Sequence, residues 1–386
     1  MNDPTPFRRI AVVGAGAVGS WFGAMLARAG HAVVLIGRAP HVEAIRRDGL
    51  RVESRAGSET VRLEADTGIA AVRGADLVLF CVKSPDTDAV ARAMAPHLEA
   101  NALVLSLQNG VDNAATIARH VRCAVVPSVV YVATALPAPG TVAHYGRGDL
   151  VIGSKDAALQ ARLRALVDLF ASAQVPVAVS PDVMGELWRK LMLNCAYNAI
   201  SAIAQQPYGR MTALAEVRAV MREVVEEVVT VARADGQSLA LDECLQAMEK
   251  LAPAMPTQLS STSQDLARGK ASEIDHLNGF VARRGAELGV PTPVKRTLHA
   301  LVKLAEAARV AAGGRSASSR RRSSRGCSPA VRCRRRHRRA WGRPRRAPPS
   351  CACCPPAWPT ARAGPPTSTP RWPRRRCPRP PRTSAP

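Results

Sequence analysis

Residues 9–29, RIAVVGAGAVGSWFGAMLARA, contain an apolar run, a glycine-rich turn and a second, longer apolar segment in immediate succession. The first run, residues 9–13, predicts a short buried strand, and the longer segment predicts a helix. Between them, Gly14, Gly16 and Gly19 give the spacing G-x-G-x-x-G in the order strand, turn, helix, which is the context in which this spacing is informative. This order predicts the first strand and first helix of a parallel α/β sheet.

Each glycine of this turn has a physical reason. Gly14 permits the tight turn, Gly16 lets the main chain approach a pyrophosphate, and Gly19 lets the helix pack closely on the strand. The free N–H groups at the start of the helix expected over residues 20–29 would then face the phosphates. We therefore expect a dinucleotide to be bound by Gly14, Ala15, Gly16, Ala17, Val18 and Gly19.

The residue after the second expected strand indicates which dinucleotide is bound. Residues 32–36 form an apolar run that ends in Gly37-Arg38. A protein that binds NAD usually carries an acidic residue here for the ribose 2′-OH, whereas Arg38 suits a 2′-phosphate by charge and by its two-pronged geometry. We expect NADP(H) as the cofactor, and the alternative is that Arg38 is a solvated loop residue.

Two further apolar runs end in polar residues. Residues 76–82 are followed by Lys83-Ser84, and residues 103–107 by Gln108-Asn109-Gly110. Ligands of open α/β sheets bind at the carboxyl ends of the strands, so we expect Lys83 and Asn109 to meet cofactor or substrate. A turn role for Asn109-Gly110 is the alternative.

The rest of the chain to residue 312 divides into two kinds of segment. From residue 121 to 180, short and mostly antiparallel strands are expected at 128–135, 141–145, 150–152 and 175–179, with a helix at 159–171. From residue 181 to 312 only helices are expected, among them 216–234, 257–269, 272–288 and a last one from Pro293 to Gly313-Gly314.

The first helix of this second part carries a polar stripe. Lys190, Asn194 and Asn198 are four residues apart, so they lie on one face of a helix. Most other positions are apolar, which is typical of a buried helix, and buried ammonium and amide groups need partners. We expect the stripe to face a polar ligand in a cleft, and the alternative is an exposed helix with a Glu186–Lys190 pair.

Two more polar segments follow. Ser272 has Asp275 three residues on, the spacing of a capping box, which would place Glu273 in a first helical turn where the helix dipole favours its ionised form. Ser261 stands in a run of four hydroxyl residues, which compete with helical hydrogen bonds. A ligand contact would explain this run, and so would an exposed face.

Taken together, these motifs make residues 9–312 resemble the ketopantoate reductase family. The resemblance rests on the glycine turn, Arg38, Val82-Lys83-Ser84, Asn109-Gly110, Glu186-Leu187-Trp188-Arg189-Lys190-Leu191 with Asn194 and Asn198, and Ser272-Glu273-Ile274-Asp275 with Asn278-Gly279. The family reduces 2-dehydropantoate to pantoate with NADPH, a step towards pantothenate and coenzyme A.

The resemblance implies an α/β Rossmann-type domain over residues 1–180 and an all-α substrate domain over residues 181–312. It implies that Lys190 is the catalytic lysine and Glu273 the second catalytic residue. It further implies substrate contacts by Asn109, Asn194, Asn198 and Ser261, and cofactor contacts by Arg38, Lys83 and Asn109. Hydride transfer to a 2-oxo acid puts negative charge on the carbonyl oxygen, which an ammonium can stabilise and protonate.

Other functions stay open from sequence. The chain could reduce another short, branched 2-oxo acid, act on 3-hydroxy acids, or bind NADPH without catalysis.

Four cysteines in residues 1–312 form no close pair, as in a cytoplasmic protein with reduced thiols, and no metal site is expected. Arg8-Arg9 and the uncharged run to Ala27 look like a signal peptide, but the structured glycines favour strand and helix. No membrane span is expected, and a homodimer is left open.

Residues 313–386 have a different composition. They hold 21 Arg, 15 of the 30 Pro and 6 of the 10 Cys, with no acidic residue, so they account for all but +3 of the net charge of +24. Such a segment is expected to be disordered. It reads most simply as an out-of-frame translation of GC-rich DNA; a nucleic-acid or membrane-surface arm and a metal site at Cys351, Cys353 and Cys354 are the alternatives.

Overall fold

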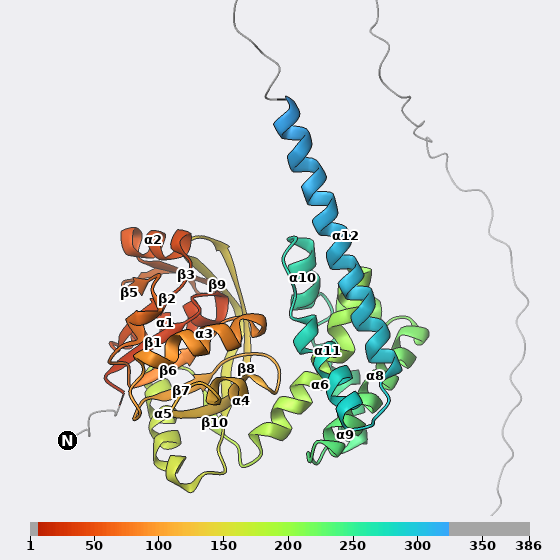
Figure 1. Cartoon of the computed structure of the whole chain (residues 1–386), viewed down its shortest axis with the longest axis horizontal. Coiled ribbons are helices and arrows are strands. Elements are labelled where there is room, and N and C mark those ends of the chain that lie inside the picture. The colour runs from red at the N-terminus through yellow and green to blue at the C-terminus, as the bar shows by residue number, and fades with distance from the viewer. Residues whose placement is uncertain (1–6, 324–386) are drawn as a thin grey trace, which may run out of the picture. The chain divides into compact units, whose positions relative to one another are not determined.

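A computed structural model of the chain describes residues 7–323, with side chains as far as residue 309. The first half is built on a parallel-rich sheet (Figure 1) in the order β4-β3-β9-β8-β7-β6-β1-β2-β5, with β10 beside β9. Its strands are β1 (Arg9–Val13), β2 (Ala32–Ile36), β3 (Leu50–Ser54), β4 (Gly57–Val61), β5 (Glu64–Asp66), β6 (Leu77–Phe80), β7 (Leu103–Ser106), β8 (Ala124–Ala138), β9 (Thr141–Ile152) and β10 (Val177–Val179).

The centre of the sheet, β5-β2-β1-β6-β7 and the start of β8, is parallel and covered on both faces. Ile10 and Val12 of β1 pack in one core with residues of α1 (Ala17–Arg28) and α5 (Gln160–Ser172). Ala11 and Val13 point to the other face, into a core that includes residues of α3 (Thr87–Met94) and α4 (Asn113–Ala118). The order of strands and the two covered faces confirm the expected Rossmann-type architecture.

The second half is helical within the described residues, as expected (Figure 1). It consists of α6 (Val183–Ala204), α7 (Tyr208–Met211), α8 (Ala215–Ala234), α9 (Leu241–Ala254), α10 (Ser261–Ala267), the 3₁₀ turn η5 (Ile274–His276), α11 (Asn278–Glu287) and α12 (Pro293–Ser323). Trp188 and Tyr197 of α6 are almost fully buried and belong to one core with apolar residues of α8 and α9. Helix α6 is therefore the central helix of this half, which fits its apolar sequence.

Several expected boundaries are wrong. The separate short strands at 128–135, 141–145 and 150–152 are parts of two long antiparallel strands, β8 and β9. Register shifts near Val132 let the pairing continue past Gly146-Arg147-Gly148, where we expected a break; such bulges disturb a ladder without ending it. Helix α12 runs to Ser323, past the Gly313-Gly314 pair, because glycine weakens a helix without forbidding it.

Three expectations remain: reduced cysteines, no membrane span, and a disordered Arg-rich segment. Cys123, Cys195 and Cys244 are buried and Cys81 is half-buried, all as free thiols. Among the helices of residues 7–323, none is long and apolar enough to cross a membrane. The disorder predicted for residues 313–386 is wrong for residues 313–323, which form the end of α12. Residues 324–386, with Cys351, Cys353 and Cys354, lie outside the described residues.

Candidate active site

The glycine turn after β1 has the geometry that a bound pyrophosphate requires. Gly14 has φ +101°, and a Cβ there would lie 2.6 Å from the main-chain nitrogen of Val82. A Cβ on Gly19 would lie 2.4 Å from the carbonyl oxygen of Gly14, whereas one on Gly16 would meet nothing closer than 4.0 Å. Gly19 is thus needed for packing, and the space beside Gly16 is open.

The start of α1 completes this cradle. Gly16 is the N-cap of α1 and no side chain caps the first turn. The N–H groups of that turn therefore lack the usual side-chain acceptor and suit an anion. A phosphate-bearing dinucleotide fits both features.

Arg38 follows the second strand, as predicted, and is exposed at the N-cap of α2 (Ala39–Asp48). A Cβ on its neighbour Gly37 would lie 2.7 Å from the Cβ of Ala15, so the end of β2 touches the glycine turn. Arg38 is placed at the carboxyl end of β2, where a ribose of a dinucleotide lies in this fold.

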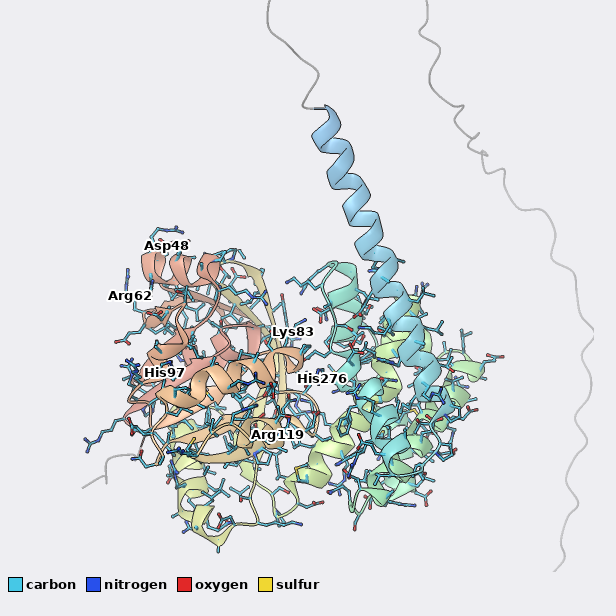
Figure 2. The ribbon with its side chains drawn as sticks, viewed as in Figure 1. Asp48, Arg62, Lys83, His97, Arg119 and His276 are labelled. Atoms are coloured by element: carbon cyan, nitrogen blue, oxygen red, sulfur yellow. The ribbon has the colours of Figure 1, made fainter. Side chains whose placement is uncertain are left out.

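The loop after β6 reaches into the helical half. The Lys83 ammonium donates to Asp265 Oδ2 at 2.9 Å and to the carbonyl oxygen of Ala271 at 3.1 Å, so it extends to α10 (Figure 2). The main-chain N–H of Ser84 donates to Glu273 Oε1 at 2.9 Å, and the hydroxyl of Ser84 lies 3.0 Å from the same oxygen. Lys83 and Ser84 therefore bind two different acidic side chains of the helical half.

Asn109 joins the same group through its main chain. Its carbonyl oxygen lies 3.2 Å from the Ser84 hydroxyl and accepts from Asn113 Nδ2 at 2.7 Å. Gly110 follows with φ +100°, so the turn role that we weighed for Asn109-Gly110 is real as well. Ser84, Asn109 and Glu273 meet at the carboxyl ends of β6 and β7.

Glu273 reaches this place from a turn and not from a helix. The helix predicted over 272–288 ends as expected, but its predicted start is wrong: Glu273 precedes the short turn η5, and α11 begins only at Asn278. The capping box does not form. The Ser272 hydroxyl donates to Glu306 of α12 and accepts from the N–H of Ile274, and the Asp275 carboxylate is bonded to His299 of α12. Freed from a helical turn, the Glu273 carboxylate extends to Ser84.

Lys190 lies on α6 and points to the long hairpin. Its ammonium donates to the carbonyl oxygen of Val130 and lies 5.5 Å from the centre of the Tyr131 ring, on which the Arg147 guanidinium also stacks at 4.1 Å. The alternative of a Glu186–Lys190 surface pair is wrong, since Glu186 pairs with Arg189 at 3.1 Å.

The surroundings of Lys190 change its acidity. Burial lowers the pKa of its ammonium to about 8, the carboxylate of Glu273 opposes this shift, Arg147 adds to it and Asp149 opposes it. Loss of hydration disfavours the charged form of a lysine, which explains the direction. Lys190 can therefore give up a proton near neutral pH.

The other members of the polar stripe lie further along α6. Asn194 is half-buried, and Asn198 is only 3% exposed. Asn198 Nδ2 lies 3.5 Å from the hydroxyl of Ser261, which is exposed at the start of α10. Ser260 explains part of the hydroxyl run, because it caps α10 by accepting from the N–H of Ser263 at 3.0 Å.

The predicted residues thus form neighbouring groups. Among side chains as far as residue 309, no hydrogen bond joins Lys190 to Glu273, although the carboxylate acts on the lysine electrostatically. No sequence motif pointed to Tyr131 or Asp265, and Ser84 had no expected role of its own. The position of Ser84 beside Lys83 at a strand end could have identified it from the sequence.

Family models match most of the described chain. The model described as "Ketopantoate reductase PanE/ApbA" matches residues 10–157, and "Ketopantoate reductase PanE/ApbA C terminal" matches residues 182–306. These two matches cover the sheet and the helices that carry the site described above.

Similar proteins cover the same region. A 2-dehydropantoate 2-reductase of Halobacterium salinarum is 35% identical over 77% of this chain and 99% of its own length, and one of Vibrio cholerae is 32% identical over 77% and 97%. The crystal structure of a PanE/ApbA family ketopantoate reductase from Ralstonia eutropha JMP134 is 54% identical, with TM-score 0.74 over 78% of this chain and 99% of that one. A D-mandelate dehydrogenase with NADH, at 24% identity and TM-score 0.73, shares the fold. This chain belongs to the ketopantoate reductase family.

Proposed function

We propose that this protein reduces the 2-oxo group of 2-dehydropantoate to the hydroxyl group of pantoate with NADPH. The observation that carries the proposal is Lys190, a half-buried ammonium that binds the carbonyl oxygen of Val130; burial lowers its pKa to about 8 against the opposing charge of Glu273. Relatives of the same family named 2-dehydropantoate 2-reductase support the choice of substrate.

The cofactor would be held by the turn from Gly14 to Gly19, with the uncapped start of α1 at its pyrophosphate and Arg38 at the 2′-phosphate. When bound, NADPH supplies the hydride for the substrate carbon. Lys83 is proposed as a further contact, for which it would exchange its present acceptors, Asp265 and Ala271, for the cofactor.

Lys190 is proposed as the general acid. As negative charge grows on the substrate oxygen, the ammonium stabilises that charge and then delivers its proton to the oxygen. Val130 and Tyr131 hold the ammonium in place before the reaction. The carboxylate of Glu273, held at Oε1 by Ser84, can orient the ammonium or accept a hydrogen bond from the product hydroxyl.

Asn109, Asn194, Asn198 and Ser261 are proposed to hold the substrate. Amide and hydroxyl groups bind a carboxylate and a hydroxyl without adding net charge, so they bring no further charge to bear on the pKa of Lys190. Asn198 and Ser261 already lie side by side, which supports a shared ligand for this pair. A small 2-oxo acid is the partner proposed; the cytoplasmic location and a homodimer stay predictions.

The test is NADPH oxidation by the full chain with 2-dehydropantoate and a panel of other 2-oxo acids. We expect a strong preference for 2-dehydropantoate, and a loss of turnover of roughly 100-fold or more in Lys190→Ala with modest change in NADPH affinity. Near-normal turnover of this variant would exclude Lys190 as the acid. Turnover with another acid only would keep the mechanism and change the substrate, and NADPH binding with no turnover at all would point to a non-catalytic protein.

A further inference from the structure

Both sides of the turn that carries Glu273 are bound by α12. Before Glu273, the main-chain N–H and the hydroxyl of Ser272 donate to Glu306 Oε1 at 2.9 and 2.6 Å. After it, the carboxylate of Asp275 accepts from Lys303 at 2.8 Å. The turn is therefore fixed to a helix outside the site at two points that flank the proposed catalytic carboxylate.

Lys303 connects these two points. Its ammonium lies 3.0 Å from Glu306 Oε2 as well as 2.8 Å from Asp275 Oδ2, and His299 Nε2 lies 2.6 Å from Asp275 Oδ1. His299, Lys303 and Glu306 follow one another by four and three residues, so one face of α12 presents all three. We call these three residues the α12 clamp.

The clamp is more than a set of surface ion pairs. An exposed pair contributes little on its own, but here Glu306 also binds the main-chain N–H of Ser272, a residue that is 5% exposed. Burial works to raise the pKa of Glu306 and of Asp275, yet their bonds to Ser272, Lys303 and His299 hold both values below the ordinary range. Both carboxylates are therefore charged at neutral pH.

Glu273, which lies between these two bound points, is the residue that the α12 clamp orients. Glu273 Oε1 is bonded to Ser84 on the sheet, and its carboxylate acts electrostatically on Lys190 of α6. A displacement of about 1 Å of a reacting group can cost roughly 100-fold in rate. Holding Ser272 and Asp275 limits such displacement.

We propose that Lys303 and Glu306 are positioning residues for the reduction, which fix the turn 272–275 on α12 so that Glu273 stays aligned with Ser84 and Lys190. This inference rests on the proposed function, in which Glu273 is catalytic. It predicts that the clamp acts on turnover only through Glu273.

The experiment is a double-mutant cycle on the full chain with Lys303→Met and Glu273→Gln. We expect Lys303→Met to lower kcat roughly 10- to 100-fold with NADPH affinity unchanged, and Lys303→Arg to recover most of the loss. In the Glu273→Gln background, Lys303→Met should lower kcat by less than about twofold more. The matched control is Arg222→Met, which breaks an ion pair of 2.7 Å with Glu249 at similar exposure, 49% against 44% for Lys303, and should leave kcat unchanged.

Equal losses from Lys303→Met in both backgrounds, or wild-type kcat in the single variant, would overturn the inference. Should Lys303→Met unfold below the assay temperature, Glu306→Gln replaces it in the same cycle, because glutamine keeps an acceptor for Ser272 and loses the charge opposite Lys303. Wild-type turnover of Glu273→Gln alone would instead overturn the proposed role of Glu273, so the two failures are distinguishable.

Discussion

At the scale of single residues, the acidity of Lys190 makes a direct prediction. A general acid must be protonated to act, and burial lowers the pKa of this ammonium to about 8. We expect kcat/KM for reduction to be level below about pH 8 and to fall about tenfold per pH unit above it. The measurement is the pH profile of NADPH oxidation. The rate of the reverse reaction, which needs the neutral amine, should rise over the same pH range. If the rate of reduction does not change between pH 6 and pH 10, Lys190 is not the general acid.

The exposed guanidinium of Arg38 makes a second prediction. If it binds the 2′-phosphate, Arg38→Ala should weaken NADPH roughly 10- to 100-fold, since hydrogen bonds to charged groups contribute about 1.5–3 kcal/mol each. NADH, which lacks this phosphate, should be affected by less than about twofold, a range within the effect of a surface change. The measurement is the affinity of the variant and of the wild-type chain for NADPH and for NADH, each determined by titration. Equal weakening of both would assign Arg38 to the solvated loop that we weighed as the alternative.

The site was predictable where spacing carried the information. Lys190, Asn194 and Asn198 share a face of one helix, so their spacing of four residues was enough to group them. Ser84 and Glu273 meet across 189 residues of chain, and only the folded structure brings them together. Tyr131 lies near Lys190 because β8 passes α6, a tertiary contact with no local signal.

At the scale of elements, two glycines of the same turn should behave differently. A Cβ on Gly19 would lie 2.4 Å from the Gly14 carbonyl oxygen, so Gly19→Ala should push α1 from β1 and destabilise the fold by about 1–3 kcal/mol. A Cβ on Gly16 meets only open space, and Gly16 has an extended main chain that alanine adopts. Gly16→Ala should therefore keep the unfolding temperature and lose NADPH affinity, because the methyl group fills the approach to the pyrophosphate.

Thermal unfolding and NADPH titration of both variants are the check. The pair is its own control, since the two substitutions add the same methyl group three residues apart. A stable Gly19→Ala protein, or a Gly16→Ala protein with wild-type NADPH affinity, would show that the turn does not work as its geometry indicates.

Elements were predictable from sequence where local periodicity was strong. β1 has the predicted residues, because five apolar residues bounded by a glycine turn leave little choice. The turn at Glu273 was not predictable, because the side chains that bind Ser272 and Asp275 lie on α12, more than twenty residues later. Glu306 accepts a hydrogen bond from Ser272, and His299 binds the carboxylate of Asp275. Tertiary partners overrode a local cap.

At the scale of the whole chain, most of the net charge and the proposed site lie on opposite sides of residue 312. The 21 Arg of residues 313–386 account for all but +3 of the net charge, whereas every residue proposed for the site and the α12 clamp precedes Ala312. A chain that ends at Ala312 loses the last turns of α12 but keeps every one of these residues, so we expect kcat and KM within about twofold of those of the full chain. Binding to a polyanion such as heparin should be strong and steeply salt-dependent in the full chain and absent from the shortened one. Turnover assays test the first expectation, and heparin retention at several salt concentrations tests the second. Loss of turnover on shortening would place part of the catalytic machinery beyond residue 312, and polyanion binding that survives shortening would place it on the enzyme body.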